Sequence, residues 1–202
     1  MGGPPAAISL SLLLVHDQPE QARLLQEALE SLGHRVLALC PSGQQACGLR
    51  SRLQPDLALI KDRLGDMDGL AAAREMQRRG VLPVVVLLEP GRNGVCLNQA
   101  EGVYGYLPAS PGPELLGPAL ELVWQRFQRV RSLEGQVAGL RQTLAERKAI
   151  ERAKGIVMEQ LGLGETEARA RLEQEAQRQG LSLVQMAEGV ITTRSLKEAQ
   201  PK

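Results

Sequence analysis

The chain has 202 residues, of which 43% are hydrophobic, a length that accommodates one large domain or two small ones. Its formal net charge of +1 excludes a protein that is positive over its whole surface, and leaves local basic patches for any contact with a nucleic acid. Aromatic residues make up only 2% of the chain, which excludes nucleic-acid binding on an aromatic stacking platform.

The cysteines and the termini indicate where the protein works. The number of cysteines is odd, and none of them has CxxC spacing, which favours free thiols in a reducing compartment. The three are Cys40, Cys47 and Cys96. Residues 1–7 lack the basic segment of an export signal, and no apolar run approaches the roughly 20 residues of a membrane span. We therefore expect a cytoplasmic protein with no membrane partner.

The first part of the chain alternates strands with helices. Apolar runs predict strands over residues 8–15, 35–39, 56–60, 83–88 and 103–107. Helices are expected to follow the first three strands, ending at Gly33, Leu53 and Arg79, with a short helix at 95–100. Short loops between such elements indicate a parallel sheet covered on both sides, so we predict a doubly wound α/β domain of five strands.

From Glu114 onward the spacing of apolar residues changes to gaps of about three and four, which is the heptad pattern of a coiled coil. We expect a long helix that outgrows the first domain and pairs with a second copy of the chain. The alternative is a long helix folded back onto its own domain. The predicted dimer seam comprises Leu116, Leu120, Val123, Phe127, Val130, Val137, Leu140 and Leu144.

The last part of the chain is divided by glycines at Gly162, Gly164 and Gly180, which predicts a compact set of three helices. Basic residues left outside its small core can meet phosphates and stack on splayed bases, or can be solvated charges paired with glutamates at helical spacing. Lys154 can instead position the first of these helices, and Gly155 is expected to permit close helix contact. The candidates for RNA contact are Arg147, Lys148, Arg152, Lys154, Arg169, Arg171, Arg178 and Arg194.

Roughly the first 120 residues resemble the receiver domain of two-component response regulators, which has a flavodoxin-like fold. The resemblance rests on VHDQPE, PDLALIKDRLGDMDGL, PVVVLL and GYLPAS. The resemblance places the acidic pair that binds Mg²⁺ at His16 and Asp17, and the phospho-acceptor at Lys61. It places the hydroxyl that senses the phosphate at Leu88, and the lysine that contacts the phosphate at Ala109. An ammonium group cannot form an acyl phosphate and repels Mg²⁺, so we expect a pseudo-receiver that is not phosphorylated.

Asp17 has two possible roles in this altered pocket. It can cap the helix that follows, or it can pair with Lys61, an attraction of roughly 4 kcal/mol at about 4 Å before desolvation is subtracted. Our hypothesis is that Lys61 takes the place of the metal and locks the pocket in one state. Neither Asp62 nor Asp66 is expected to replace the acceptor. For Asp62, a shift of one residue along a strand turns the side chain to the other face.

Residues 146–191 resemble the ANTAR domain, through ERAKGI-M, the G-L-x-E-x-E-A run from Gly162 and the final A-x-x-I pattern. The resemblance is nearest to nitrate- and amide-responsive antiterminators, which join a degenerate receiver to ANTAR through a coiled coil. It implies a dimer that binds paired hairpins in the leader of a nascent transcript, under the control of a small-molecule-sensing protein. Family members often carry a basic, Asn-rich turn before the last helix, and the turn Gln177–Gly180 departs from it, which argues against base contacts there.

The sequence thus predicts a pseudo-receiver domain over residues 8–120, a coiled-coil linker over 114–146 and an all-α, three-helix ANTAR domain over 147–196. No nucleophile–base pair or metal cluster is evident, so neither an enzyme nor a cofactor is expected. The last helix is too apolar for a DNA recognition helix, which favours RNA over DNA. A protein-interaction adaptor remains the alternative.

Overall fold

The computed structural model describes residues 8–90 and 102–198, with side chains as far as Arg194. The chain divides into two compact units, Met1–Arg131 and Ser132–Lys202. The short helix predicted at residues 95–100 lies outside the described residues.

The first unit is built on a five-stranded parallel sheet in the order β2-β1-β3-β4-β5. Two of the inner strands, β1 and β3, are largely apolar, and no residue of β3 is exposed, as expected for strands covered on both faces. This order confirms the predicted doubly wound fold. The strands are β1 (Ser11–Val15), β2 (Arg35–Cys40), β3 (Leu57–Lys61), β4 (Val84–Leu88) and β5 (Val103–Pro108).

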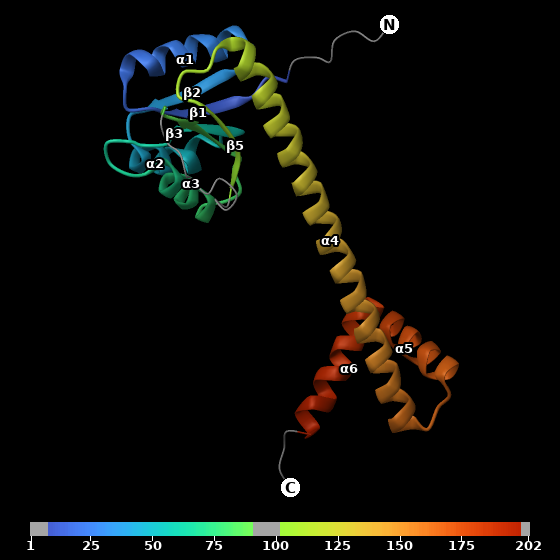
Figure 1. Ribbon diagram of the computed structural model, residues 1–202. Coiled ribbons are helices and arrows are strands. Elements are labelled where there is room, and N and C mark those ends of the chain that lie inside the picture. The colour runs from blue at the N-terminus through green and yellow to red at the C-terminus, as the bar shows by residue number, and fades with distance from the viewer. Residues whose placement is uncertain (1–7, 91–101, 199–202) are drawn as a thin grey trace, which may run out of the picture. The chain divides into compact units, whose positions relative to one another are not determined.

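Helices cover both faces of this sheet (Figure 1). Side chains from α2 (Gly43–Leu53) and α3 (Gly69–Arg78) pack with one set of strand residues, around Met76. Side chains from α1 (Pro19–Ser31) and from the start of α4 (Pro113–Leu161) pack with the other set, around Leu29 and Leu120. Because all the strands are parallel, their carboxyl ends lie at one edge of the sheet, which is where doubly wound folds place their functional crevice.

The turn between β3 and α3 folds tightly against the end of β3. Asp68 caps α3 by accepting hydrogen bonds from the amides of Leu70 and Ala71. A Cβ added at Gly69 would lie 2.2 Å from the carbonyl oxygen of Lys61, so only glycine fits this close approach. The DMDGL turn therefore fixes the end of β3, where Lys61 lies.

The second unit consists of three helices. The chain leaves the sheet in α4 (Pro113–Leu161), a helix of 49 residues, and continues through α5 (Glu165–Gln179) and α6 (Leu183–Glu198). Gly162 and Gly180 have φ values of 66° and 67°, the left-handed conformation in which a helix can end and the chain reverse. The helices enclose a core of Ala153, Val157, Ala168, Leu172, Ala176, Met186 and Ala187.

The first half of the predicted dimer seam lies inside the first unit. Leu116, Leu120 and Val123 are at most 5% exposed and pack against the sheet, and the Phe127 ring contacts Tyr104 with centroids 5.3 Å apart. These residues are unavailable to a second chain, because the start of α4 supplies the last layer of the doubly wound fold. Val130 is partly buried, whereas Val137, Leu140 and Leu144 are exposed. With Leu133, which is exposed at the same spacing, these three residues form what we call the exposed stripe of α4.

Candidate functional site

Lys61 ends β3 at the functional edge of the sheet and is only 5% exposed. Its Nζ lies 2.9 Å from Oδ1 of Asp17, which follows β1, and 3.3 Å from Oε1 of Glu89, which follows β4. The predicted ion pair between Lys61 and Asp17 is therefore present. Gln18, not Asp17, holds the N-cap position of α1, so the predicted capping role of Asp17 is wrong.

The charges in this pocket are fixed by their neighbours. Burial alone would lower the pKa of Lys61, but the hydrogen bonds to Asp17 and Glu89 outweigh it and raise the pKa, so the ammonium stays charged. Burial, together with the charge of Lys61, lowers the pKa of His16, which is only 1% exposed. Nδ1 of His16 accepts a hydrogen bond from the amide of Gln18 at 3.2 Å, and the neutral ring carries its proton on Nε2.

The other receiver positions also lack the required chemistry. Leu88 is partly buried and Ala109 is 7% exposed, and neither carries a group that can bind phosphate. Asp62 is fully buried, out of reach of a phosphoryl donor in solution. Asp66 accepts hydrogen bonds from the amides of Gly43 and Gln44, both at 3.0 Å, so its carboxylate is committed to the start of α2. Lys61, Asp17 and Glu89 therefore form an ion-pair cluster at this edge of the sheet, with the lysine buried and the two carboxylates partly exposed.

Sequence reasoning missed Glu89 as a partner of Lys61. The signal was its position directly after β4, because the carboxyl ends of neighbouring parallel strands bring the following residues together. A lysine at the end of β3 therefore had two carboxylates within reach.

Lys154, a leading candidate for RNA contact, is buried in the second unit. Its Nζ lies 2.5 Å from Oε2 of Glu151 and 2.6 Å from Oε1 of Glu165, and its side chain is 10% exposed. These two carboxylates raise the pKa of Lys154. The side chain joins α4 to the first turn of α5, the positioning role that the sequence left open.

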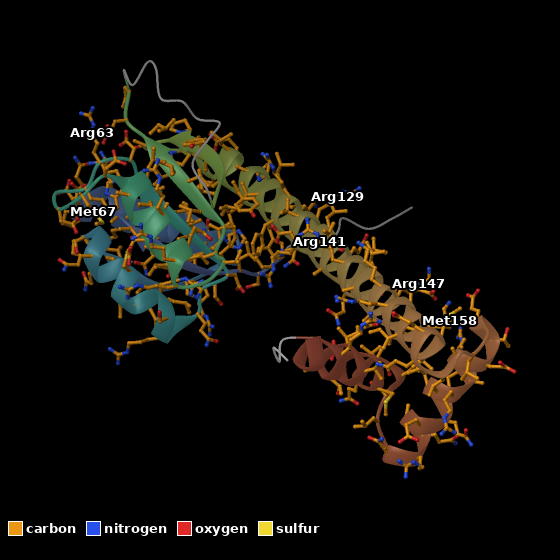
Figure 2. The ribbon with its side chains drawn as sticks, turned by 90° about the horizontal axis from the view of Figure 1, so that it is seen from below. Arg63, Met67, Arg129, Arg141, Arg147 and Met158 are labelled. Carbon is orange, nitrogen blue, oxygen red and sulfur yellow. The ribbon has the colours of Figure 1, made fainter. Side chains whose placement is uncertain are left out.

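The remaining candidates fall into two groups. Arg169 pairs with Glu173 at 2.9 Å and Arg178 with Glu175 at 2.5 Å, and Arg171 donates to Gln174 at 3.5 Å. Among the described residues, Arg147, Lys148 and Arg152 have no such partner and are exposed on α4. Figure 2 labels Arg147, whose side chain projects from α4, together with Arg129 and Arg141. Arg194, on α6, pairs with Glu159.

Gly155 does not permit a close helix contact within the chain. It is exposed, and a Cβ built there meets nothing within 4 Å, so the packing role predicted for it is wrong.

Comparisons with known proteins follow the same division of the chain. The ANTAR domain model matches residues 138–191, and the response regulator receiver domain model matches residues 12–98. The chain is 30% identical over 189 residues to the transcriptional regulatory protein PdtaR of Mycobacterium tuberculosis (strain H37Rv), covering 93% of this chain and 92% of PdtaR. The chain belongs to the ANTAR-domain response regulators. Both matched domain families are regulatory rather than catalytic.

Other relatives of this ANTAR-domain response regulator match parts of it. It is 35% identical over 83 residues to the nitrate regulatory protein of Klebsiella oxytoca, covering 41% of this chain and 21% of that protein. The signal receiver domain of a modulated diguanylate cyclase from Desulfovibrio desulfuricans G20 superposes with a TM-score of 0.54 at 26% identity, covering 59% of this chain and 96% of that domain. None of the described helices combines the length and apolarity needed to cross a membrane, and the described residues hold no cluster suited to a metal ion.

Proposed function

We propose that this ANTAR-domain response regulator acts in transcription antitermination, by binding paired hairpins in the leader of a nascent transcript. The observation that carries the proposal is the ANTAR match on a three-helix unit, with Arg147, Lys148 and Arg152 exposed near the end of α4. Unpaired guanidinium and ammonium groups can contact phosphates without first breaking an internal ion pair. The duplex stems would supply phosphates, and the splayed loop bases would supply specificity.

The test starts from a pool of RNAs, each with two adjacent hairpins whose loops are randomised. RNAs that bind the full-length protein are enriched from this pool, and their affinity is then measured. We expect the enriched RNA to bind tightly, to lose affinity when its loops are replaced, and to lose affinity steeply as salt rises. Duplex DNA of equal length serves as competitor. Failure to enrich any hairpin, or equal binding to all three nucleic acids, would overturn the proposal and leave a protein-interaction adaptor.

We infer that this activity is controlled without phosphorylation of the receiver unit. Lys61 stands at the phospho-acceptor position, and its ammonium already pairs with both Asp17 and Glu89, the carboxylates that border the pocket. Mg²⁺ would meet a cation instead of a free acidic site. Incubation with acetyl phosphate and Mg²⁺ should add no phosphoryl mass to the intact protein, and a stoichiometric mass shift would refute this part of the proposal.

Dimerisation is proposed through the exposed stripe of α4, from Leu133 to Leu144. Leu133, Val137, Leu140 and Leu144 follow the three-and-four spacing and are 46–72% exposed, which is costly for a single helix and removed by pairing two. Without a phosphoryl input, a small-molecule-sensing protein that masks this stripe or the second unit would control RNA binding.

A further inference from the structure

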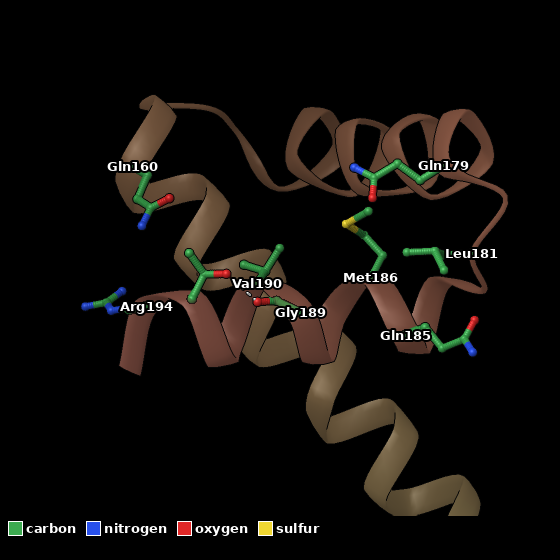
Figure 3. A pocket seen from close by; sticks show the side chains of 9 residues that line it. Gln160, Gln179, Leu181, Gln185, Met186, Gly189, Val190 and Arg194 are labelled. Atoms are coloured by element: carbon green, nitrogen blue, oxygen red, sulfur yellow. Dashed lines mark hydrogen bonds between the residues drawn. The ribbon is translucent and has the colours of Figure 1, made fainter. Parts of the chain in front are cut away.

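The second unit contains a pocket that none of the roles described above uses. Its volume is about 310 Å³, and it lies between the end of α4, the end of α5 and one face of α6. Figure 3 shows Gln160 and Arg194 towards one end of the pocket, and Gln179, Leu181 and Gln185 towards the other. A volume at the lower end of the range for small-molecule sites suits one small flat group.

The lining offers an apolar surface for a flat ring. Met186 is 8% exposed, and with Leu181 and Val190 it forms the apolar part of the pocket. A thioether makes favourable contacts with aromatic rings. The four aromatic residues of the chain, at positions 104, 106, 124 and 127, all belong to the first unit, so a ring bound by the second unit must pack on aliphatic, thioether or guanidinium groups.

Two amides at the rim are held in fixed orientations. Nε2 of Gln179 donates to Oε1 of Glu175 at 2.5 Å, which leaves Oε1 of Gln179 as an acceptor. Oε1 of Gln185 accepts from the amide of Ser182 at 2.9 Å, which leaves Nε2 of Gln185 as a donor. The free Oε1 of Gln179, on a side chain that is already held in place, can accept a hydrogen bond from the edge of a nucleobase.

Glu175 keeps the Gln179 amide in place. Its Oε1 also accepts from Nη2 of Arg178 at 2.5 Å. The hydrogen bonds from Arg178 and Gln179 lower the pKa of Glu175 to about 2, so this carboxylate remains ionised at neutral pH. The turn before α6 can therefore present a base-reading group although it lacks the basic, Asn-rich composition common in the family.

The charge of the lining favours a neutral group, such as a nucleobase, over an acidic or a cationic ligand. No carboxylate lines the pocket, and Arg194 contributes a guanidinium group at the end away from Gln185. The Arg194 side chain is held by Glu159 and is 32% exposed. A neutral base suits this lining, because Glu159 already balances the charge of Arg194 and the apolar surface and amides need no counter-charge.

We propose that this pocket holds one unpaired base of the RNA loop, an inference that rests on the RNA binding proposed above. Gly189 makes the proposal testable, because it lines the pocket from within α6 and a Cβ built there meets nothing within 4 Å. Gly189→Leu should fill the pocket while favouring the helix, since leucine is a better helix former than glycine. Gly139→Leu is the matched control, because Gly139 is a helical glycine of α4 with the same open space, and it is neither a pocket residue nor one of the four apolar residues of the exposed stripe.

The experiment measures the affinity of full-length wild type, Gly189→Leu and Gly139→Leu for the enriched two-hairpin RNA and for copies with one loop nucleotide at a time made abasic. Wild type should lose about tenfold at one loop position, the size expected for one base contact. Gly189→Leu should lose about tenfold on the intact RNA and nothing further on that abasic copy, while Gly139→Leu should match wild type. Circular dichroism establishes that both variants are folded.

Two other outcomes are distinguishable. Wild-type affinity in a folded Gly189→Leu variant, or an abasic effect that persists undiminished in it, would overturn the base pocket and leave RNA binding intact. Absence of RNA binding by the wild type would overturn the proposed function and the pocket together.

Discussion

Lys61 carries a charge that the first unit has to satisfy internally. Its ammonium lies between Asp17 and Glu89, while its side chain is almost entirely buried. Lys61→Met should lower the free energy of unfolding by about 1–3 kcal/mol, because it removes two charge-assisted hydrogen bonds and leaves two carboxylates facing each other. Urea denaturation measures the change. Arg23→Met, which breaks the exposed Arg23–Glu27 pair, is the control and should cost under about 1 kcal/mol; equal losses would contradict the account.

His16 links the stability of the same pocket to pH. Its pKa in the folded protein lies below the ordinary value of 6.5, because burial and then the charge of Lys61 disfavour the protonated ring. As pH falls, His16 therefore binds a proton in the unfolded chain before it does so in the folded protein. The contribution of neutral His16 to the free energy of unfolding is present above pH 6.5 and is lost as pH falls. We expect the free energy of unfolding to fall between pH 7 and 5, and the fall to be smaller in His16→Asn, which keeps an acceptor for Gln18.

The control for this titration is the other histidine. His34 also has a pKa lowered by burial, so His34→Asn should remove its own share of the pH dependence and leave that of His16. A wild-type slope in His16→Asn would show that His16 does not titrate on unfolding.

In the second unit, some exposed basic residues form no ion pair with a carboxylate among the described residues, whereas others do. Arg152→Ala should weaken binding to the enriched RNA and reduce the slope of log affinity against log salt by about 1, as expected for one lost phosphate contact. Arg169→Ala removes the same charge from a residue already paired with Glu173 and should have a smaller effect. Filter binding at several salt concentrations measures both, and indistinguishable losses would mean that only overall charge matters.

At the scale of the elements, α4 has different tasks along its length. Leu140→Glu places a charge in the exposed stripe and should weaken dimerisation on the order of a hundredfold, because two leucines lose their burial. Leu122→Glu is the control, since Leu122 is 67% exposed on the part of α4 that packs on the sheet and should leave the dimer unchanged. Analytical ultracentrifugation measures the dissociation constant. A monomeric wild type would contradict the proposed seam.

The sequence was sufficient for the five strands, for the doubly wound fold and for the Lys61–Asp17 contact, because each follows from local pattern or from the edge at which parallel strands end. It could not assign the heptad residues to a partner. The same apolar spacing serves a helix on a sheet and a helix in a coiled coil, and Leu116 to Phe127 took the first role. Lys154 was equally ambiguous, because nothing local indicates that Glu165 closes over it from α5.

At the scale of the whole molecule, one helix contributes to both hydrophobic cores. Leu116 and Leu120 at the start of α4 belong to the core of the first unit, and Ala153 and Val157 near its end belong to the core of the second. A single continuous helix therefore links the proposed RNA-binding residues to the unit that holds Lys61, whose ammonium pairs with Asp17 and Glu89. We expect the output of this regulator to be independent of phosphoryl donors.

The most direct test is transcription in vitro through a template that places the enriched two-hairpin RNA upstream of an intrinsic terminator. We expect the wild-type protein to raise readthrough, acetyl phosphate with Mg²⁺ to leave the increase unchanged, and Arg152→Ala to reduce it. Readthrough that stays at the level without protein, or that rises only when the phosphoryl donor is present, would contradict a phosphorylation-independent antiterminator.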